Sequence, residues 1–388
     1  MKPRRYQLRK EAIGVALRHP WIFRDHLSSA ASVLRDGELL RLVDGQNAVV
    51  GHGFYEASGA IAIRMLRRGA ALPDAAWLRG QLTTAVARRA ELATRTDAIR
   101  LVHGESDDLP AVVVDRFADT LVVSSYAAGA DALARYAAHA LGRPGLVDPI
   151  IGPARHVVLR PAHLRQGPAE PARTLRGSPP AVVSITEHGL SLAVDLASGQ
   201  KTGTYLDLRG LRRELAAAPL AGARVLNLFA YSGMLGRAAE VAGAGTIVQV
   251  DASERALAFA AAHHTGDPAK HTFVAADVFR WLPELTAEPF DLVIVDPPAM
   301  TSKATQIPAV LAGYRKLYRA AARHVRPGGT LIAACCTSRI ERAVFHQTVR
   351  EALGPPFTLH HEIPPEPDHP IGFPQADYLK LAWWVRST

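Results

Sequence analysis

The stretch Phe290-Asp291-Leu292-Val293-Ile294-Val295-Asp296-Pro297-Pro298 joins a short apolar run to an acid and two prolines. The run from Phe290 to Val295 has the length and composition of a buried parallel strand. A second such run, Thr330 to Ala334, leads into Cys335-Cys336-Thr337. Open α/β sheets bind ligands at the carboxyl ends of their strands, so we expect Asp296 and a thiol to lie over one crevice.

The chain contains only two cysteines, Cys335 and Cys336, and they are adjacent. Unpaired cysteine often behaves as a buried small hydrophobe, which is the alternative to a catalytic role. Adjacent cysteines are poorly placed to bridge each other and too few for a structural zinc site, so neither a disulfide nor a metal is expected. Strand alternation sends the two side chains to opposite faces. We therefore expect Cys336 to face the site and Cys335 to pack.

Strands and helices alternate along the chain from Arg224 onward. This rhythm predicts an α/β fold with a doubly wound parallel sheet, a Rossmann-like domain. The expected elements before Phe290 are strands at Val225 to Phe229, Thr246 to Val250 and Thr272 to Ala275, and helices at Met234 to Ala242 and Glu254 to His263.

The first half of the chain has a different composition. Short alternating runs with turns from Leu39 to Leu66 predict a small β-rich module, and Ala75 to Ala93 has a helical pattern. Ile99 to Val114 and Leu121 to Ser125 are expected strands of a middle segment. Five prolines between Pro161 and Pro180 indicate a linker. The expected domains are a β-rich domain (1–75), a middle α+β domain (76–165), a Pro-rich linker (166–180) and the α/β domain (181–388).

The net charge is +9, and most of it lies near the N-terminus. Residues 1–80 carry thirteen Lys and Arg against seven Asp and Glu, an excess of six positive charges. Lys and Arg neutralise phosphates and release counterions, so this excess predicts an RNA partner. The alternative is compositional, because thirty-eight Arg against seven Lys is typical of a GC-rich genome.

The sequence gives no sign of a membrane segment. It contains no run of eighteen apolar residues, and Met1 to Lys10 is basic without an apolar core. We therefore expect neither a secretory signal nor a membrane span, and a cytoplasmic location.

The first strand of the α/β domain leads into Asn227-Leu228-Phe229-Ala230-Tyr231-Ser232-Gly233, and the second ends at Asp251, whose carboxylate can accept ribose hydroxyls. A nicotinamide dinucleotide needs a glycine-rich loop for its pyrophosphate, but this loop carries bulky Phe229 and Tyr231. S-adenosylmethionine (SAM) has no phosphate, so we expect SAM. Asp277 is placed to accept from the adenine amino group. The alternative for each acid is a loop or helix-cap role.

Six motifs of this domain are shared with a known family. They are Gly199-Gln200-Lys201-Thr202-Gly203-Thr204-Tyr205-Leu206-Asp207, Asn227 to Gly233, Val250 to Ser253, Asp291 to Pro298, Pro327-Gly328-Gly329 and Phe373 to Lys380. They resemble those of class I methyltransferases of the RlmI type, bacterial enzymes that form 5-methylcytosine in large-subunit ribosomal RNA. His19 to Phe23 is similar to the start of that family's PUA domain, and Gly104 to Pro110 to its middle domain. The resemblance therefore spans nearly the whole chain.

Three positions depart from the family's pattern. Cys335-Cys336-Thr337 stands where the family usually has Ser-Cys-Ser, and Leu208 stands where it has Gln. The usual Asn after the second helix is replaced by the His263-His264 region. The nucleophile position is retained at Cys336.

The resemblance implies that Cys336 is the nucleophile and that Asp296 holds the pyrimidine edge. Cytosine C5 is a poor carbon nucleophile, so a thiolate must first add at C6. The expected function is SAM-dependent formation of 5-methylcytosine in RNA through this covalent adduct. The implied cofactor-binding residues are Thr202, Tyr205, Asp207, Arg209, Asn227, Phe229, Ala230, Tyr231, Gly233, Asp251, Ala252, Ser253, Asp277, Val278, Asp296 and Pro297.

Other functions stay open at the level of sequence. Amino-methyltransferases commonly carry an aromatic residue after their Pro-Pro, whereas Ala299 and Met300 follow here, so N-methylation is disfavoured. A class I methyltransferase acting on a small molecule, and an RNA-binding assembly factor with a retained SAM pocket, are the two alternatives. For the oligomeric state, a homodimer is one open option.

Overall fold

The computed structural model describes residues 3–28, 33–161, 172–301 and 303–388. The chain divides into two compact units. The first contains residues 1–189, 194–206 and 367–373, and the second contains residues 190–193, 207–366 and 374–388. The chain passes between the units more than once, so no single residue separates them. Within the described ranges, every helix is too short or too polar to cross a lipid bilayer.

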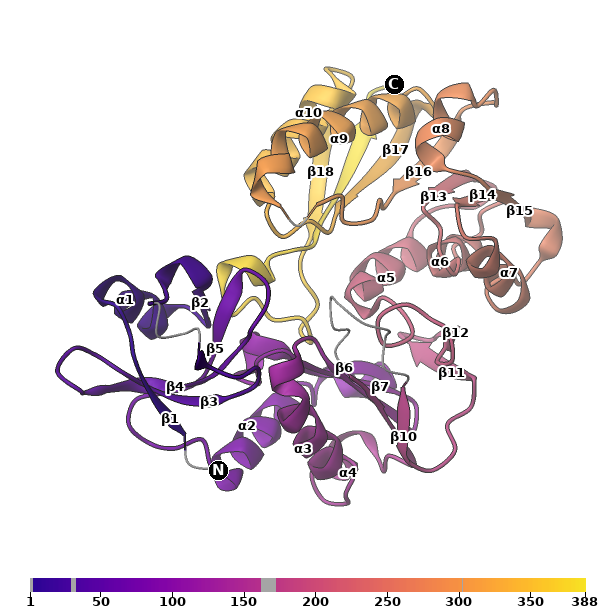
Figure 1. Ribbon diagram of the computed structural model, residues 1–388. Helices are drawn as coiled ribbons and strands as arrows, with labels where there is room; N and C mark the ends of the chain where they lie inside the picture. The colour runs from indigo at the N-terminus through magenta and orange to yellow at the C-terminus, as the bar shows by residue number, and fades with distance from the viewer. Residues whose placement is uncertain (1–2, 29–32, 162–171, 302) are drawn as a thin grey trace. The chain divides into compact units, whose positions relative to one another are not determined.

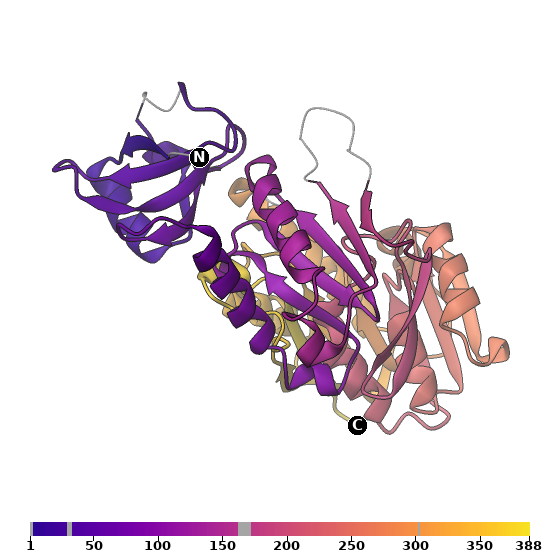
Figure 2. The ribbon, with the colours of Figure 1, turned by 90° about the horizontal axis from the view of Figure 1, so that it is seen from below.

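The N-terminal part of the first unit is a five-stranded sheet with one packed helix, shown in indigo in Figure 2. Its elements are β1 (Arg4–Gln7), α1 (Lys10–Arg18), β2 (Trp21–Phe23), β3 (Leu39–Val43), β4 (Val49–Tyr55) and β5 (Ile61–Arg68). The strand order is β1-β3-β4-β5-β2, antiparallel except for the parallel pair of β1 and β3. Alternate strand residues such as Leu40 and Ile63 pack against Ala12 and Ala16 of the helix. The expected β-rich N-terminal fold is confirmed.

A second five-stranded sheet follows in the same unit. Its elements are α2 (Ala75–Ala87), β6 (Ala98–His103), β7 (Val112–Phe117), β8 (Thr120–Ser125), α3 (Asp131–Leu141), α4 (Asp148–Ile151), β9 (His156–Arg160) and β10 (Arg173–Arg176). The order is β10-β9-β8-β7-β6, and α3 connects the parallel strands β8 and β9. Buried leucine, valine and alanine side chains of α2, α3 and the sheet form its core.

Three expectations for this middle region need correction. The single strand expected from Ile99 to Val114 is two strands, because a 3-10 turn at Gly104–Asp107 interrupts it. The helix expected to reach Ala93 ends at Ala87. Part of the expected linker, Arg173–Arg176, is strand β10, which pairs with β9. Residues 162–171, which include the first residues of the expected linker, lie outside the described residues.

The second unit is built on a seven-stranded sheet, and a hairpin of β11 (Val182–Glu187) and β12 (Leu190–Asp195) precedes it. Its elements are α5 (Arg209–Ala217), β13 (Arg224–Leu228), α6 (Met234–Val241), β14 (Thr246–Asp251), α7 (Glu254–His263), β15 (His271–Ala275), α8 (Val278–Trp281), β16 (Phe290–Val295), α9 (Ile307–Ala322), β17 (Val325–Cys335), α10 (Arg342–Leu353), β18 (Phe357–Ile363) and β19 (Lys380–Arg386). Figure 1 shows α8, α9 and α10 on one side of the sheet and α5, α6 and α7 on the other. The doubly wound sheet is confirmed.

The strand order, β15-β14-β13-β16-β17-β19-β18, fixes where ligands bind. The strands are parallel except β19, which runs antiparallel to both neighbours. The chain moves from β13 outward to β15 and then returns to place β16 on the other side of β13. In open α/β sheets such a switch in direction produces a crevice that binds ligands, so we expect the ligand crevice at the carboxyl ends of β13 and β16.

Candidate active site at the carboxyl ends of the strands

The loop after β13 has a strained backbone. Phe229 and Tyr231 have φ angles of 61° and 48°, in the left-handed region that bulky residues rarely adopt. Such strain persists only where surrounding contacts hold it, and it concentrates at functional sites. Here the Ala230 N–H donates to the Val250 carbonyl at 3.0 Å, and Ala230 itself is buried. The sequence predicted a cofactor loop here, and the strain supports that role.

Asp251, at the end of β14, is the anchor of this loop. Its Oδ2 accepts a hydrogen bond from the Tyr231 N–H at 2.8 Å, and its Oδ1 accepts from the Ser253 N–H at 2.8 Å. Each carboxylate oxygen has a second lone pair, so the half-buried group can still accept ribose hydroxyls. Ser253 caps α7 by accepting from the Ala256 N–H, and Ala252 between them is exposed. The predicted cofactor residue thus also holds the loop.

Asp277, after β15, caps α8 by accepting from the Phe279 N–H at 2.9 Å. This cap is the alternative role expected for the acid, and the exposed carboxylate is accessible to an adenine amino group. Val278 is 2% exposed and packs in the core, so its side chain does not face the crevice. Sequence reasoning missed Phe279, which is 41% exposed and meets the Phe229 ring edge-on at 5.4 Å.

Two predicted cofactor residues, Asn227 and Gly233, help to hold the loop in place. Asn227 is fully buried on β13, and its amide donates to Gln249 Oε1 at 3.2 Å. Its own Oδ1 is a buried acceptor with no hydrogen-bond partner among the described residues. Gly233 has a φ angle of 76°, and a Cβ there would lie 2.6 Å from the Ala260 Cβ. Glycine is therefore required for the close approach of the loop to α7.

His264 is a further support that sequence reasoning did not assign to the site. Its Nε2 accepts from the Ala193 N–H at 2.9 Å, so its Nδ1 carries the hydrogen that is donated to the Ser232 carbonyl. Burial, the largest effect, lowers the pKa of His264 to about 4, so the ring is neutral at pH 7. The imidazole therefore connects β12 to the cofactor loop as a fixed neutral tautomer.

The Asp296-Pro297-Pro298 and Cys335-Cys336-Thr337 motifs meet at this edge. Cys336 is half-buried, and its Sγ lies 3.6 Å from the carbonyl oxygen of Pro297. Asp296, the residue before Pro297, is also half-buried. Cys335 is fully buried against α9, as strand alternation predicted. The Tyr318 hydroxyl donates to the Ala334 carbonyl at 2.6 Å, which holds the end of β17 in place.

Two other predicted cofactor residues lie in the second unit with protein partners. Asp207 Oδ2 accepts from the Tyr378 hydroxyl at 2.7 Å. Arg209 is fully buried, and its Nη1 lies 3.1 Å from Glu366 Oε2. A buried guanidinium that is already paired is more readily explained as structural than as a cofactor contact.

Thr202 and Tyr205 belong to the first unit. The Thr202 hydroxyl donates to Asp115 Oδ2 at 2.5 Å and is buried, and the Lys201 ammonium lies 4.1 Å from the Tyr205 ring centroid. Their cofactor role stays a prediction.

The residues at the switch point suit SAM. A wide loop with aromatic residues, a carboxylate at the end of the second strand and an acid after the third give apolar surface and acceptors for an adenosine, without a glycine-rich phosphate cradle. The fold and this crevice define a Rossmann-like methyltransferase domain.

Comparisons with known proteins agree. Residues 132–380 match the family described as S-adenosylmethionine-dependent methyltransferase, and residues 9–68 match the PUA-like domain. The chain therefore belongs to the S-adenosylmethionine-dependent methyltransferase family, and SAM is its cofactor.

Among its relatives is Ribosomal RNA large subunit methyltransferase I of Klebsiella pneumoniae, 33% identical over 380 residues, or 94% of this chain and 93% of the relative. Ribosomal RNA large subunit methyltransferase of Deinococcus radiodurans is 31% identical over 382 residues, which cover 94% of this chain and 93% of the relative. A solved structure of a proposed SAM-dependent methyltransferase from Streptococcus mutans has the same fold, with a TM-score of 0.82, 21% identity, and 98% of this chain and 100% of that chain covered. Another solved structure, of a proposed methyltransferase in complex with S-adenosyl-L-homocysteine (SAH), has a TM-score of 0.83 and 21% identity, and 98% of this chain and 100% of that chain are covered.

We expect Asp251→Ala to weaken SAM binding by about tenfold or more. The change removes the acceptor for ribose hydroxyls and the anchor of the Tyr231 amide, and each hydrogen bond contributes about 0.5–1.5 kcal/mol. Calorimetric titration with SAM measures the effect. Asp267→Ala is the matched control, because this carboxylate caps the turn Pro268–Lys270. Unchanged affinity in Asp251→Ala, or tight NADH binding without a response to SAM, would contradict the assignment.

The low pKa of His264 predicts a pH dependence of stability. The pKa is about 4 in the folded state and 6.5 ordinarily, so as pH falls the unfolded chain takes up the proton first. Stability should therefore fall between pH 6.5 and about 4, by up to about 3 kcal/mol from this residue. Denaturant unfolding should show a shallower pH dependence for His264→Gln than for the wild type. His139→Gln, which changes an exposed histidine of α3, should follow the wild type, and parallel curves for all three proteins would exclude the effect.

Proposed function

We propose that this methyltransferase forms 5-methylcytosine in large-subunit ribosomal RNA, in the cytoplasm, through a covalent bond between Cys336 and C6 of the base. The observation that carries the proposal is the position of Cys336, whose Sγ lies 3.6 Å from the Pro297 carbonyl of the Asp296-Pro297-Pro298 motif. Relatives named as ribosomal RNA large subunit methyltransferases and the PUA-like match support RNA as the substrate.

Cys336 would start the reaction. Its proton leaves the sulfur, and the thiolate electron pair forms a bond to C6, which moves electron density through the ring toward C5. Asp296, after the neighbouring strand, would accept a hydrogen bond from the N4 amino group, and its negative charge would favour protonation of N3, whose N–H would then also donate to it. The two side chains would thus hold and activate the same ring from adjacent strand ends.

When bound, SAM supplies an electrophilic methyl group on its sulfonium. The loop from Phe229 to Gly233 and the Asp251 carboxylate would orient the cofactor toward the Cys336 side of the crevice. Once C5 carries the methyl group, the C5 and N3 protons would pass to solvent, the C5–H electron pair would form the C5–C6 double bond, and the C6–Sγ electron pair would return to Cys336. The thiolate would therefore be regenerated in each turnover.

The two cysteines separate the roles of catalysis and packing. We expect Cys336→Ala to abolish methyl transfer while SAM binding is preserved, because only the nucleophile is lost. Cys335→Ala should reduce stability through lost packing and retain substantial activity, because Cys335 is fully buried. Transfer of labelled methyl groups from SAM to ribosomal RNA measures activity, and a metabolite extract tests the small-molecule alternative.

RNA with 5-fluorocytosine at the target should trap the wild-type enzyme, because fluorine cannot leave C5 as the proton does. The Cys336 variant should form no adduct. An active Cys336→Ala enzyme would rule out the covalent mechanism, and an adduct mapped to Cys335 would show that the other sulfur attacks. Binding of SAM and RNA without any transfer would favour an assembly factor.

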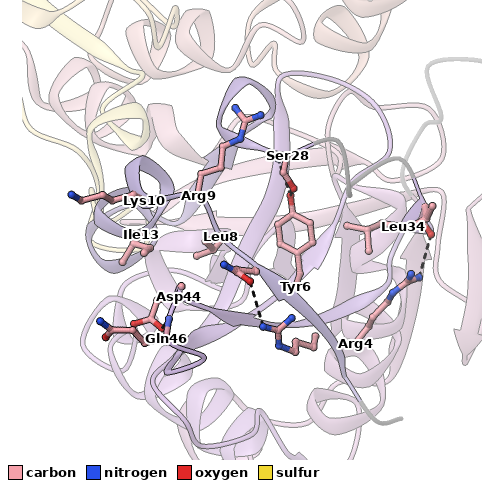
Figure 3. A pocket seen from close by; sticks show the side chains of 14 residues that line it. Arg4, Tyr6, Leu8, Arg9, Lys10, Ile13, Ser28, Leu34, Asp44 and Gln46 are labelled. Atoms are coloured by element: carbon pink, nitrogen blue, oxygen red, sulfur yellow. Dashed lines mark hydrogen bonds between the residues drawn. The ribbon is translucent and has the colours of Figure 1, made fainter.

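The N-terminal sheet carries a basic groove, defined here as the hollow of about 860 Å³ beside β1 and the start of α1. Figure 3 shows Arg9 and Lys10 on the segment that leads from β1 into α1. Neither side chain makes a hydrogen bond or ion pair with a described residue, and both residues are exposed. Arg4, by contrast, pairs with Glu38 at 3.3 Å, and Arg5 donates to Asn47. We infer that Arg9 and Lys10 bind RNA phosphates.

We expect the double substitution Arg9→Gln and Lys10→Gln to weaken RNA binding and to lower the slope of log K against log salt by about 1.5, because two phosphate contacts are lost. Fluorescence anisotropy with a ribosomal RNA fragment measures both. The matched control is Arg18→Gln with Arg79→Gln, because both arginines are exposed and lie outside the groove. SAM affinity should be unchanged in both proteins. If the groove variant and the control show the same slope, the charge excess is compositional.

A further inference from the structure

Lys380, the first residue of β19, is a fully buried cation. Its Nζ donates to the carbonyl oxygens of Thr337 at 3.1 Å and Tyr378 at 3.3 Å. Among the described residues it forms no ion pair with a carboxylate. Buried ammonium groups are costly unless they are paired with an anion. In the described part of the chain, this positive charge therefore has no carboxylate within ion-pair distance, and Asp377 acts on it electrostatically without such a contact.

The position of this charge is set by the sheet. The antiparallel register of β17 and β19 places Lys380 opposite Cys335, and one of the two acceptor carbonyls belongs to the residue directly after Cys336. Burial lowers the pKa of Lys380, while negative charge on either cysteine would raise it. The ammonium is thus fixed at the turn that carries the thiols.

Of the two sulfurs, only Cys336 can use this charge for chemistry on a substrate. Cys335 is fully buried in the core, where the Tyr314 hydroxyl is its neighbour from α9. Cys336 is half-buried at the crevice, with its thiol directed toward the Pro297 carbonyl. Because Cys335 is buried, a thiolate there would be inaccessible to a nucleobase bound in the crevice.

We propose that Lys380 is a positioning residue that stabilises the thiolate of Cys336 through the charge of its ammonium and through its hydrogen bonds to the surrounding turn. The nucleophilic role of Cys336 rests on the proposed function. The Cys336 S–H bond breaks, the proton passes to water and the electron pair stays on sulfur. Lys380 remains protonated throughout. When the C6–Sγ bond later breaks, the thiolate returns to the same cation.

The other charged groups at the turn do not replace Lys380. Asp377 lies 2.5 Å from Arg342 of α10, so these two charges offset each other. Asp296, after β16, opposes a thiolate. Burial raises the pKa of Tyr314 and of Tyr318 on α9, so both remain neutral at pH 7.

The test is the pH profile of Cys336 alkylation in a Cys335→Ala background, where one thiol remains. Iodoacetamide is the probe, and mass spectrometry of the Cys336 peptide gives the rate at each pH. With Lys380 present, the midpoint should lie below that of a free thiol, about 8.5. Lys380→Met should raise the midpoint by about 1 to 3 pH units. Lys380→Arg, which retains a cation, should have a midpoint between those of Lys380→Met and of the protein with Lys380.

Lys316→Gln, an exposed lysine of α9, is the control for loss of one positive charge and should leave the midpoint unchanged. Circular dichroism and SAM titration check that each variant is folded. An unchanged midpoint in folded Lys380→Met would overturn the proposal. If that variant does not fold, a midpoint at or above about 8.5 with Lys380 present would overturn it as well. Alkylation needs no turnover, so an active Cys336→Ala enzyme would refute the covalent mechanism without deciding the role of Lys380.

Discussion

The parallel register of β13, β16 and β17 is the constraint on which the site depends. Leu228 pairs with Val295, and Val295 pairs with Ala333, so the three strands end at one edge of the sheet. The cofactor loop, Asp296 and Cys336 follow these ends directly. A shift of one residue would turn every side chain of a strand to the opposite face. Packing of the hydrophobic sheet face against α9 therefore determines which side chains lie at the site.

The cofactor loop illustrates how closely strain and support are balanced. Two aromatic residues in the left-handed region, Phe229 and Tyr231, cost about 1–3 kcal/mol each. Three hydrogen bonds, made through Val250, Asp251 and His264, contribute about 0.5–1.5 kcal/mol each. These sums are similar, so the loop geometry has little excess stability of its own. Contacts with the cofactor would then add directly to the order of the loop.

Local patterns in the sequence predicted much of this sheet. The bounds of β16 and α7 and the opposite faces of Cys335 and Cys336 follow from apolar runs and alternation. Features set by distant residues were not predictable in this way. Strand β10 depends on pairing with β9, and the return of residues 367–373 to the first unit is a long-range contact. The burial of Val278 likewise depends on α9, which no local pattern reveals.

The crevice also contains an electrostatic conflict that its fold must resolve. A mechanism with a thiolate at Cys336 and a carboxylate at Asp296 places two negative charges over one edge. At an effective dielectric constant of about 20, unit charges about 6 Å apart repel by roughly 3 kcal/mol, equivalent to about two pKa units. Hydrogen bonds from a cytosine would reduce the repulsion only after the base has bound. In the free enzyme the opposing charge must come from the protein, and Lys380 is fully buried at that turn.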